Sequence, residues 1–224
     1  MSAHQGGVPA RKRAAVLISG RGSNMAALVR AAAAPDFPAE IALVLSNRAD
    51  AAGLDFAQSH GIATHVLSHK GFADREAFDA ALDGVLRDAG VEIVCLAGFM
   101  RLLTPWLVER WRDRMINVHP SLLPSFKGLH THERALEAGV RVHGCTVHFV
   151  RAEMDEGPII LQAVVPIEPG DTPNVLADRV LTQEHVIYPK GLELLAAGRL
   201  TVANERVDIA GVEKGLQPLI APKV

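Results

Sequence analysis

Three shortages narrow what this chain of 224 residues can be. It has two cysteines, Cys95 and Cys145, too few for a disulfide framework, and we expect both to be buried thiols in a reducing compartment. No apolar run reaches the roughly 18 residues that a membrane helix needs. The 23 basic and 25 acidic residues leave a net charge of −2, which argues against nucleic acid as the main partner. We therefore expect a cytoplasmic protein that binds small molecules and neither nucleic acid nor membrane.

The N-terminal segment, residues 1–13, reads MSAHQGGVPARKR and lacks the apolar central region of a secretory signal. We interpret it as a disordered extension. The remaining length suits one domain of ordinary size, and no internal repeat or long linker divides it.

Short apolar runs alternate with helical patterns along the first half of the chain. The runs predict strands, and the stretches between them predict helices: strands at 14–19, 41–46, 63–67, 92–97 and 115–119, and helices at 24–34, 49–59, 73–89 and 104–112. Strands that are apolar throughout indicate a parallel sheet covered on both faces, so we predict a Rossmann-like, doubly wound α/β fold. Residues 141–150 and 158–167 predict a C-terminal strand pair, and 173–198 a long helix.

Four of the predicted strands end in small or polar residues. These ends are Ser19-Gly20, Ser46-Asn47, Ala97-Gly98 and Asn117-Val118-His119. Because ligands of doubly wound sheets bind beyond the carboxyl ends of the strands, the four ends predict a site at that edge.

The sequence SGRGSNM, residues 19–25, joins the first strand to the first helix. Free amides of Gly22, Ser23 and Asn24 at a helix start favour an anion. The loop lacks the Gly-Lys-Ser/Thr ending of a Walker loop, and Met25 stands where a dinucleotide fingerprint has its third glycine. A phosphate monoester therefore fits better than a pyrophosphate, and a plain capped turn is the alternative.

Asn117 and His119 share one face of a strand because they are two residues apart. An amide donor beside a histidine can hold an oxyanion and move a proton, although a buried histidine bonded to backbone is the alternative. Asp155, in a loop between two later strands, would favour the charged form of His119. Chemistry alone leaves Glu153 and Glu156 equally plausible for that part.

Several histidines invite a metal hypothesis: His130, His132, His143, His148 and His185. None has a cysteine or carboxylate at a recognisable zinc spacing, so we expect no metal. His148 shares a strand face with Thr146, and this pair is a candidate for lining the site. In LAGFMRLL, residues 96–103, Met100 and Leu103 are candidates for the walls of a heterocycle pocket, with ordinary core as the alternative.

Together these residues resemble the glycinamide ribonucleotide formyltransferase family. The similarity covers about residues 14–205, and the motifs that carry it are VLISGRGSNM, VLSNRADAAGL, LAGFMRLL, INVHPSLLPSFKGLHTHERALEAG, HGCTVHFV, EMDEGPIILQA and QEHVIYP. The resemblance implies the formyltransferase fold, with a domain at 14–205 and a variable tail at 206–224.

The resemblance also implies residue roles, and it selects Asp155 rather than its acidic neighbours. It implies a catalytic trio of Asn117, His119 and Asp155. It implies glycinamide ribonucleotide binding by Gly22, Ser23, Asn24 and Glu184, and folate binding by Arg75, Met100, Arg101, Leu102, Leu103 and Asn117. The loop from Ala152 to Gly157 is expected to close over the pterin.

The implied reaction is formyl transfer from 10-formyltetrahydrofolate, a cosubstrate, to the amine of glycinamide ribonucleotide in purine synthesis, by a monomer or homodimer. Formyltetrahydrofolate hydrolase is an alternative, although it is expected to carry an N-terminal regulatory domain. Methionyl-tRNA formyltransferase is expected to carry a further RNA-binding domain and a basic surface. A non-catalytic nucleotide sensor is a third alternative, which explains the loop at 20–24 but not the trio.

Overall fold

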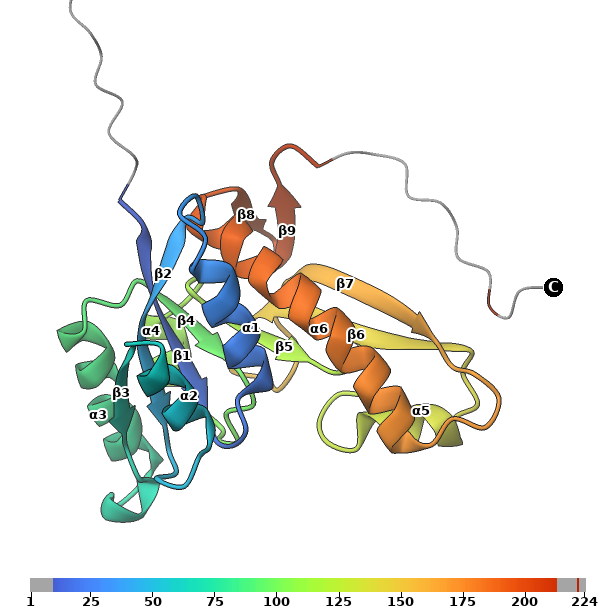
Figure 1. The fold of residues 1–224 in the computed structure, drawn as a ribbon, viewed down its shortest axis with the longest axis horizontal. Helices are drawn as coiled ribbons and strands as arrows, with labels where there is room; N and C mark the ends of the chain where they lie inside the picture. Colours follow the sequence, from blue (N-terminus) through green and yellow to red (C-terminus); the bar gives the residue numbers. More distant parts are fainter. Residues whose placement is uncertain (1–9, 213–220, 222–224) are drawn as a thin grey trace, which may run out of the picture.

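The computed structural model describes residues 10–212 and residue 221. Residues 1–9 of the expected disordered extension and residues 213–220 and 222–224 of the expected tail lie outside the described residues. The extension is shorter than predicted, because Lys12 and Arg13 already pair with Ala39 and Glu40 in the sheet. Seven strands form one sheet in the order β3-β2-β1-β4-β5-β6-β7 (Figure 1). A separate two-stranded sheet pairs β8 with β9.

The first five strands of the large sheet run parallel. They are β1 (Lys12–Ile18), β2 (Ala39–Ser46), β3 (Ala63–Val66), β4 (Ile93–Leu96) and β5 (Met115–His119). Then β6 (Val142–Phe149) pairs antiparallel with β5, and β7 (Ile159–Pro166) pairs antiparallel with β6. The mostly parallel sheet with a C-terminal strand pair is therefore confirmed, and β5 has the predicted bounds.

Helices cover both faces of the sheet, as the doubly wound prediction requires. The core on one face joins Val16 of β1 to α1 (Ser23–Ala32), α2 (Gly53–Ser59) and α6 (Pro173–Ala196). The core on the other face joins Leu17 to α3 (Arg75–Asp88) and α4 (Pro105–Arg110). Successive strand residues point to opposite faces, so β1 feeds both cores, and this explains why it is apolar throughout.

Local signals fix the start of α4, whereas α2 starts later than predicted. Thr104 caps α4 by accepting a hydrogen bond from the backbone N–H of Leu107, and Pro105 follows in the first turn, as predicted. By contrast, α2 begins at Gly53 rather than at residue 49. The segment before it contains an exposed ion pair between Arg48 and Asp50, at 2.7 Å.

The sequence patterns missed four short elements: a 3-10 turn (His69–Gly71), α5 (Thr131–Glu137), β8 (Leu200–Ala203) and β9 (Arg206–Ile209). The start of α5 has no side-chain cap, because its N-cap residue is His130 in a left-handed conformation. The β8–β9 turn has Asn204-Glu205 where hairpins usually have Asn-Gly, so the hairpin lacks its usual turn signal.

The long helix α6 lies across the sheet (Figure 1) and ties its central strands together. The hydroxyl of the fully buried Tyr188 donates to the carbonyls of Leu96 on β4 and Ile116 on β5, at 2.8 and 3.2 Å. Gly191 allows the close approach, because a Cβ there would lie 2.8 Å from Val147 Cγ1. Val175, in the first turn of the helix, is 49% exposed.

Both cysteines are buried, as predicted. Burial raises the pKa of the Cys95 and Cys145 thiols to about 12, so neither is a thiolate near neutral pH. Within the described residues, no helix is both long enough and apolar enough to cross a membrane.

Candidate active site

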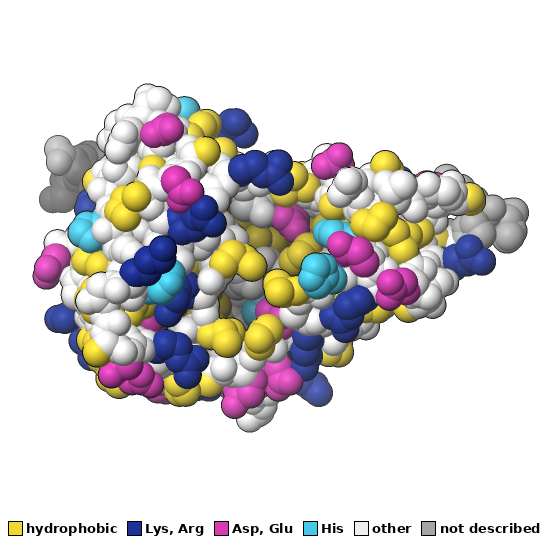
Figure 2. Space-filling view, turned by 90° about the horizontal axis from the view of Figure 1, so that it is seen from below, with side chains coloured by type: hydrophobic (Ala, Val, Ile, Leu, Met, Phe, Trp, Pro, Cys, Tyr) yellow, Lys and Arg dark blue, Asp and Glu magenta, His cyan; other side chains and the backbone are white. Residues whose placement is uncertain are grey.

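A cavity of about 800 Å³ opens at the carboxyl edge of the sheet. Figure 2 shows the hollow on this face, with hydrophobic side chains around it. One polar network joins the expected strand ends: the Ser19 hydroxyl donates to Asn47 Oδ1 at 2.6 Å and accepts from the Met100 N–H at 2.8 Å. The ends of β1 and β2 and the segment after β4 therefore meet at one edge, as the sequence predicts.

Asn117 lies on β5 directly opposite His148 on β6. Nδ2 of Asn117 is 3.2 Å from Nε2 of His148, and Nδ1 of His148 is 2.9 Å from the carbonyl oxygen of Phe149. Burial lowers the pKa of His148, so the ring is neutral near pH 7. Because a carbonyl only accepts, Nδ1 carries the proton and Nε2 accepts from Asn117. The second N–H of Asn117 is therefore left for a ligand.

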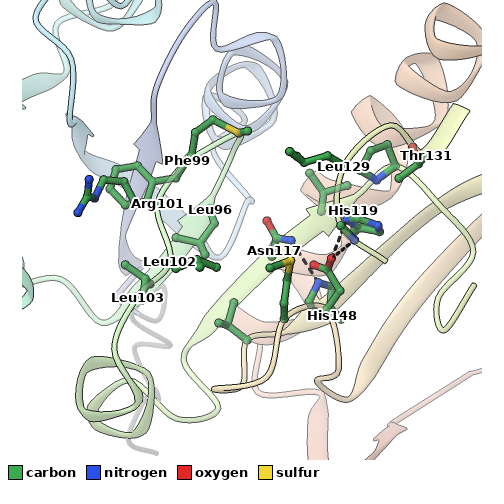
Figure 3. A pocket seen from close by; sticks show the side chains of 18 of the residues that line it. Leu96, Phe99, Arg101, Leu102, Leu103, Asn117, His119, Leu129, Thr131 and His148 are labelled. Atoms are coloured by element: carbon green, nitrogen blue, oxygen red, sulfur yellow. Dashed lines mark hydrogen bonds and ion pairs between the residues drawn. The ribbon is translucent and has the colours of Figure 1, made fainter. Parts of the chain in front are cut away.

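His119, the last residue of β5, is 6% exposed and lies between two oxygen acceptors. Its Nε2 is 3.1 Å from the carbonyl oxygen of Phe126, and its Nδ1 is 3.5 Å from Oδ2 of Asp155. His119 thus faces a backbone carbonyl with one ring nitrogen and the carboxylate of Asp155 with the other. Figure 3 shows His119, Asn117 and His148 close together at one wall of the cavity.

Asp155 belongs to the loop between β6 and β7 and has a left-handed backbone, with φ of 57°. Its Oδ2 also accepts a 2.8 Å hydrogen bond from the N–H of Gly128. Glu156 points elsewhere and pairs with Lys127 at 2.6 Å. Of these two neighbouring acids, the fold thus brings only Asp155 to His119.

The opposite wall of the cavity is apolar and comes from the segment after β4. Met100 and Leu102 are 65% and 58% exposed, and Leu103 lines the same wall. The guanidinium of Arg101 turns away from Asn117 (Figure 3). Its Cζ lies 5.2 Å from the centroid of the Phe78 ring. Arg75, the first residue of α3, is exposed and is not among the residues that line this cavity.

The expected phosphate loop meets the start of α1. Gly22 has φ of 72° and precedes the helix, and a Cβ there would lie 2.9 Å from Cε of Met25. No side chain of the described residues caps α1, so its first amides are available to an anion. Gly22 and Ser23 lie beside the cavity lining rather than in it, whereas Asn24 belongs to the lining.

Asn24 connects this loop to α6. Its Nδ2 donates a 2.6 Å hydrogen bond to Oε2 of Glu184, and its buried Oδ1 has no hydrogen-bond partner in the described part of the chain. Burial raises the pKa of Glu184, against the smaller opposite effect of the Asn24 bond. The pair therefore presents an acceptor and a buried carboxyl group to the cavity, which suits a ligand with hydroxyl or amine donors.

Two of the remaining histidines pack against each other rather than binding at the catalytic residues. His132 and His143 pack edge to face, with ring centroids 5.3 Å apart. Thr146, which was expected to line the site with His148, is fully buried and bonds the 121–123 turn instead. No group of three or more metal-ligating side chains occurs among residues 10–212 and 221.

Sequence reasoning missed the backbone groups of the site. The Phe126 carbonyl and the Gly128 N–H contact His119 and Asp155, and both come from the loop between β5 and α5. A backbone group carries no side-chain signature. Phe126 also has a left-handed backbone, with φ of 55°. Phenylalanine rarely adopts this conformation, so the sequence does not indicate it.

Comparisons with known proteins agree over most of the chain. A family model described as formyl transferase matches residues 12–192. The phosphoribosylglycinamide formyltransferase of Escherichia coli (strain K12) is 48% identical over 185 residues, 83% of this chain and 87% of that protein. The solved structure of glycinamide ribonucleotide transformylase 1 from Symbiobacterium toebii superposes with a TM-score of 0.88 at 45% identity, covering 93% of this chain and 98% of that one.

A longer relative matches as well. The trifunctional purine biosynthetic protein adenosine-3 of Bos taurus is 52% identical over 196 residues, which are 88% of this chain and 19% of that protein. The chain thus spans about a fifth of the length of this relative.

Proposed function

The chain belongs to the formyl transferase family, and from this premise we propose that it formylates glycinamide ribonucleotide. The donor is 10-formyltetrahydrofolate, and the products are formylglycinamide ribonucleotide and tetrahydrofolate. Relatives named phosphoribosylglycinamide formyltransferase and glycinamide ribonucleotide transformylase support this reaction. The observation that carries the proposal is one cavity that is lined by Asn117, His119 and Asp155 and also by the Asn24–Glu184 pair.

The cavity suits two small substrates together. Its volume of about 800 Å³ lies in the upper part of the usual range for ligand pockets. The apolar wall of Met100, Leu102 and Leu103 suits a flat pterin, while the uncapped start of α1 suits the phosphate of the ribonucleotide. Arg75 and Arg101 are assigned the more peripheral part of the folate site. Holding both reactants in one cavity removes much of the entropic barrier to their reaction.

Asn117 stabilises the charge that develops in the reaction. The amine attacks the formyl carbon and forms a C–N bond, the bond from that carbon to N10 of the folate breaks, and one proton passes from the amine to N10. The carbonyl oxygen carries negative charge at the midpoint. Because His148 accepts one N–H of Asn117, the other N–H is oriented to donate to this oxygen.

His119 supplies a second donor and moves the proton. Its Nε2 gives up the Phe126 carbonyl and donates to the reacting oxygen when the substrates bind, while Asp155 faces Nδ1 and stabilises the positive charge on the ring. We propose no metal for this step, because an amine is already a nucleophile and two N–H donors meet the oxyanion.

The proposal also covers the assembly, the location and the domain bounds of the protein. We propose a monomer or homodimer that works in the cytoplasm, and two buried free thiols suit such a reducing compartment. We also propose residues 14–205 as the catalytic domain, to which Lys12–Arg13 of β1 and Arg206–Ile209 of β9 are joined by strand pairing.

A spectrophotometric assay with purified protein, glycinamide ribonucleotide and 10-formyltetrahydrofolate tests the proposal, with a control that lacks the nucleotide. We expect deformylation of the folate only when the nucleotide is present. Deformylation without the nucleotide would overturn the proposal in favour of a hydrolase. Binding of both substrates without deformylation would overturn it in favour of a non-catalytic module.

A further inference from the structure

Arg151 begins the loop that carries Asp155, two residues after β6 ends. Its guanidinium is held on three sides: Nε donates to Glu205 at 2.7 Å, Nη2 donates to Asp113 at 2.7 Å, and Nη1 donates to the Val150 carbonyl at 3.1 Å. The side chain is 8% exposed. Arg151 lines the cavity, yet all three of its nitrogens are already bonded within the chain. It is therefore built to hold the loop rather than to bind a substrate anion.

Glu205 comes from a distant part of the chain, the turn between β8 and β9. Its other carboxylate oxygen accepts a 2.6 Å bond from Arg112, so two arginines share this one carboxylate. The bond from Arg151 is the main reason that the pKa of Glu205 lies below its usual range, and the carboxylate stays charged.

The backbone around Glu205 is strained. Asn204 and Glu205 have φ of 51° and 54°, a pair of angles for which hairpin turns favour Asn-Gly. Asp113, the other carboxylate on Arg151, also has a left-handed backbone, with φ of 56°. A glutamate in place of the favoured glycine costs backbone energy, and only its side chain provides the bonds to Arg151 and Arg112.

The hairpin that carries Glu205 is a firm support. Leu200 and Val202 of β8 and Val207 and Ile209 of β9 pack against the main core. The other end of the loop is tied separately, because Glu156 pairs with Lys127 at 2.6 Å. Contacts therefore fix the loop 151–157 on both sides of Asp155.

We propose that Glu205 and Asp113, acting through Arg151, are positioning residues that hold the loop so that Asp155 faces His119. This inference rests on the proposed function, because it assigns Asp155 a part in turnover. A single exposed ion pair contributes little, but Arg151 is buried between two carboxylates and its loop leads directly to the site. The β8–β9 hairpin accordingly helps to position the loop that carries Asp155.

The test compares Arg151→Gln and Glu205→Gln with the unaltered chain in the nucleotide-dependent assay. Displacement of a reacting group by about 1 Å costs on the order of a hundredfold in rate, so we expect kcat to fall about ten- to a hundredfold in Arg151→Gln and less in Glu205→Gln. The KM for glycinamide ribonucleotide should stay unchanged, because Asn24 and Glu184 lie on α1 and α6 and bond each other rather than the loop. Glu109→Gln is the matched control, since it removes the other carboxylate partner of Arg112 and leaves Glu205 and Arg151 unchanged.

A second arm repeats both changes in an Asp155→Asn background. If the pair acts through Asp155, Arg151→Gln should reduce the residual kcat no further. An equal fall in that background, or wild-type kcat in both single variants, would overturn the inference. If Arg151→Gln fails to fold, Glu205→Gln decides, because that side chain is half exposed and the change keeps its shape. An inactive wild-type chain would count against the proposed function instead.

Discussion

Nδ2 of Asn117 donates to Nε2 of His148 across the antiparallel pair β5 and β6, at 3.2 Å. Nε2 is free to accept because Nδ1 carries the ring proton and donates a 2.9 Å hydrogen bond to the Phe149 carbonyl. A neutral histidine thereby sets the direction of an amide that faces the cavity.

Changing His148 should therefore disturb Asn117. We expect His148→Phe, which keeps a ring but removes the acceptor, to lower kcat by about tenfold or more, since loss of one oxyanion donor typically costs about 10²–10³. His148→Gln offers an acceptor oxygen and should retain more activity. Steady-state kinetics of both variants measure this, and equal kcat values for the two would contradict the assignment.

Asp155→Asn should separate binding from turnover. The amide still accepts the Gly128 N–H but no longer places a negative charge 3.5 Å from His119. We expect kcat to fall by about two to three orders of magnitude with substrate dissociation constants little changed. Kinetics and calorimetry measure the two quantities. Glu153→Gln is the control, and a comparable loss of kcat in that variant would remove the special role of Asp155.

His143 predicts a dependence of stability on pH. Burial, together with the smaller effect of nearby His132, lowers its pKa from 6.5 to about 4. The unfolded chain therefore binds this proton more readily, so its contribution to stability is present above pH 6.5 and is lost as the pH falls toward 4. The loss amounts to roughly 3 kcal/mol in the free energy of unfolding.

Urea unfolding at pH 7 and pH 4.5 measures that loss. We expect His143→Gln to reduce the difference between the two pH values, whereas the exposed His60→Gln should leave it unchanged. An unaltered difference in His143→Gln would show that another group carries the acid sensitivity.

Gly157→Ala should damage both stability and activity. A Cβ at residue 157 would lie 1.6 Å from the carbonyl oxygen of Phe149, so the loop that carries Asp155 must move. We expect a loss of about 1–3 kcal/mol in the free energy of unfolding together with reduced kcat. Gly71→Ala is the matched control, because a Cβ there meets no atom within 4 Å. Urea denaturation and steady-state kinetics of both variants measure this, and equal stability and kcat in the two would contradict the prediction.

Gly84→Ala should stabilise the protein. Gly84 lies inside α3, and a Cβ there meets no atom within 4 Å. Alanine loses less backbone entropy than glycine in a helix, so we expect a gain of about 0.5–1 kcal/mol, seen as a higher Tm with unchanged kcat. A lower Tm would mean that the helix needs the glycine for packing.

The sequence located the core strands and the site edge because those features are local. Apolar runs specify buried parallel strands, as in β5, and Thr104-Pro105 specifies the start of α4 from adjacent residues. The small and polar strand ends predicted the edge where Ser19, Asn47 and Met100 meet. Elements without such signals, α5 and the β8–β9 hairpin, were not predicted.

What the sequence determined by itself is therefore the order of strands and helices and the residue types gathered at one edge of the sheet. Only the tertiary structure decided which of those residues meet. Asn117 and His148 are 31 residues apart and meet through strand register, and Arg151 and Glu205 are 54 residues apart and meet through the packing of a hairpin. Contacts of this kind depend on the whole core, because neighbouring residues in the chain do not encode the position of a distant partner.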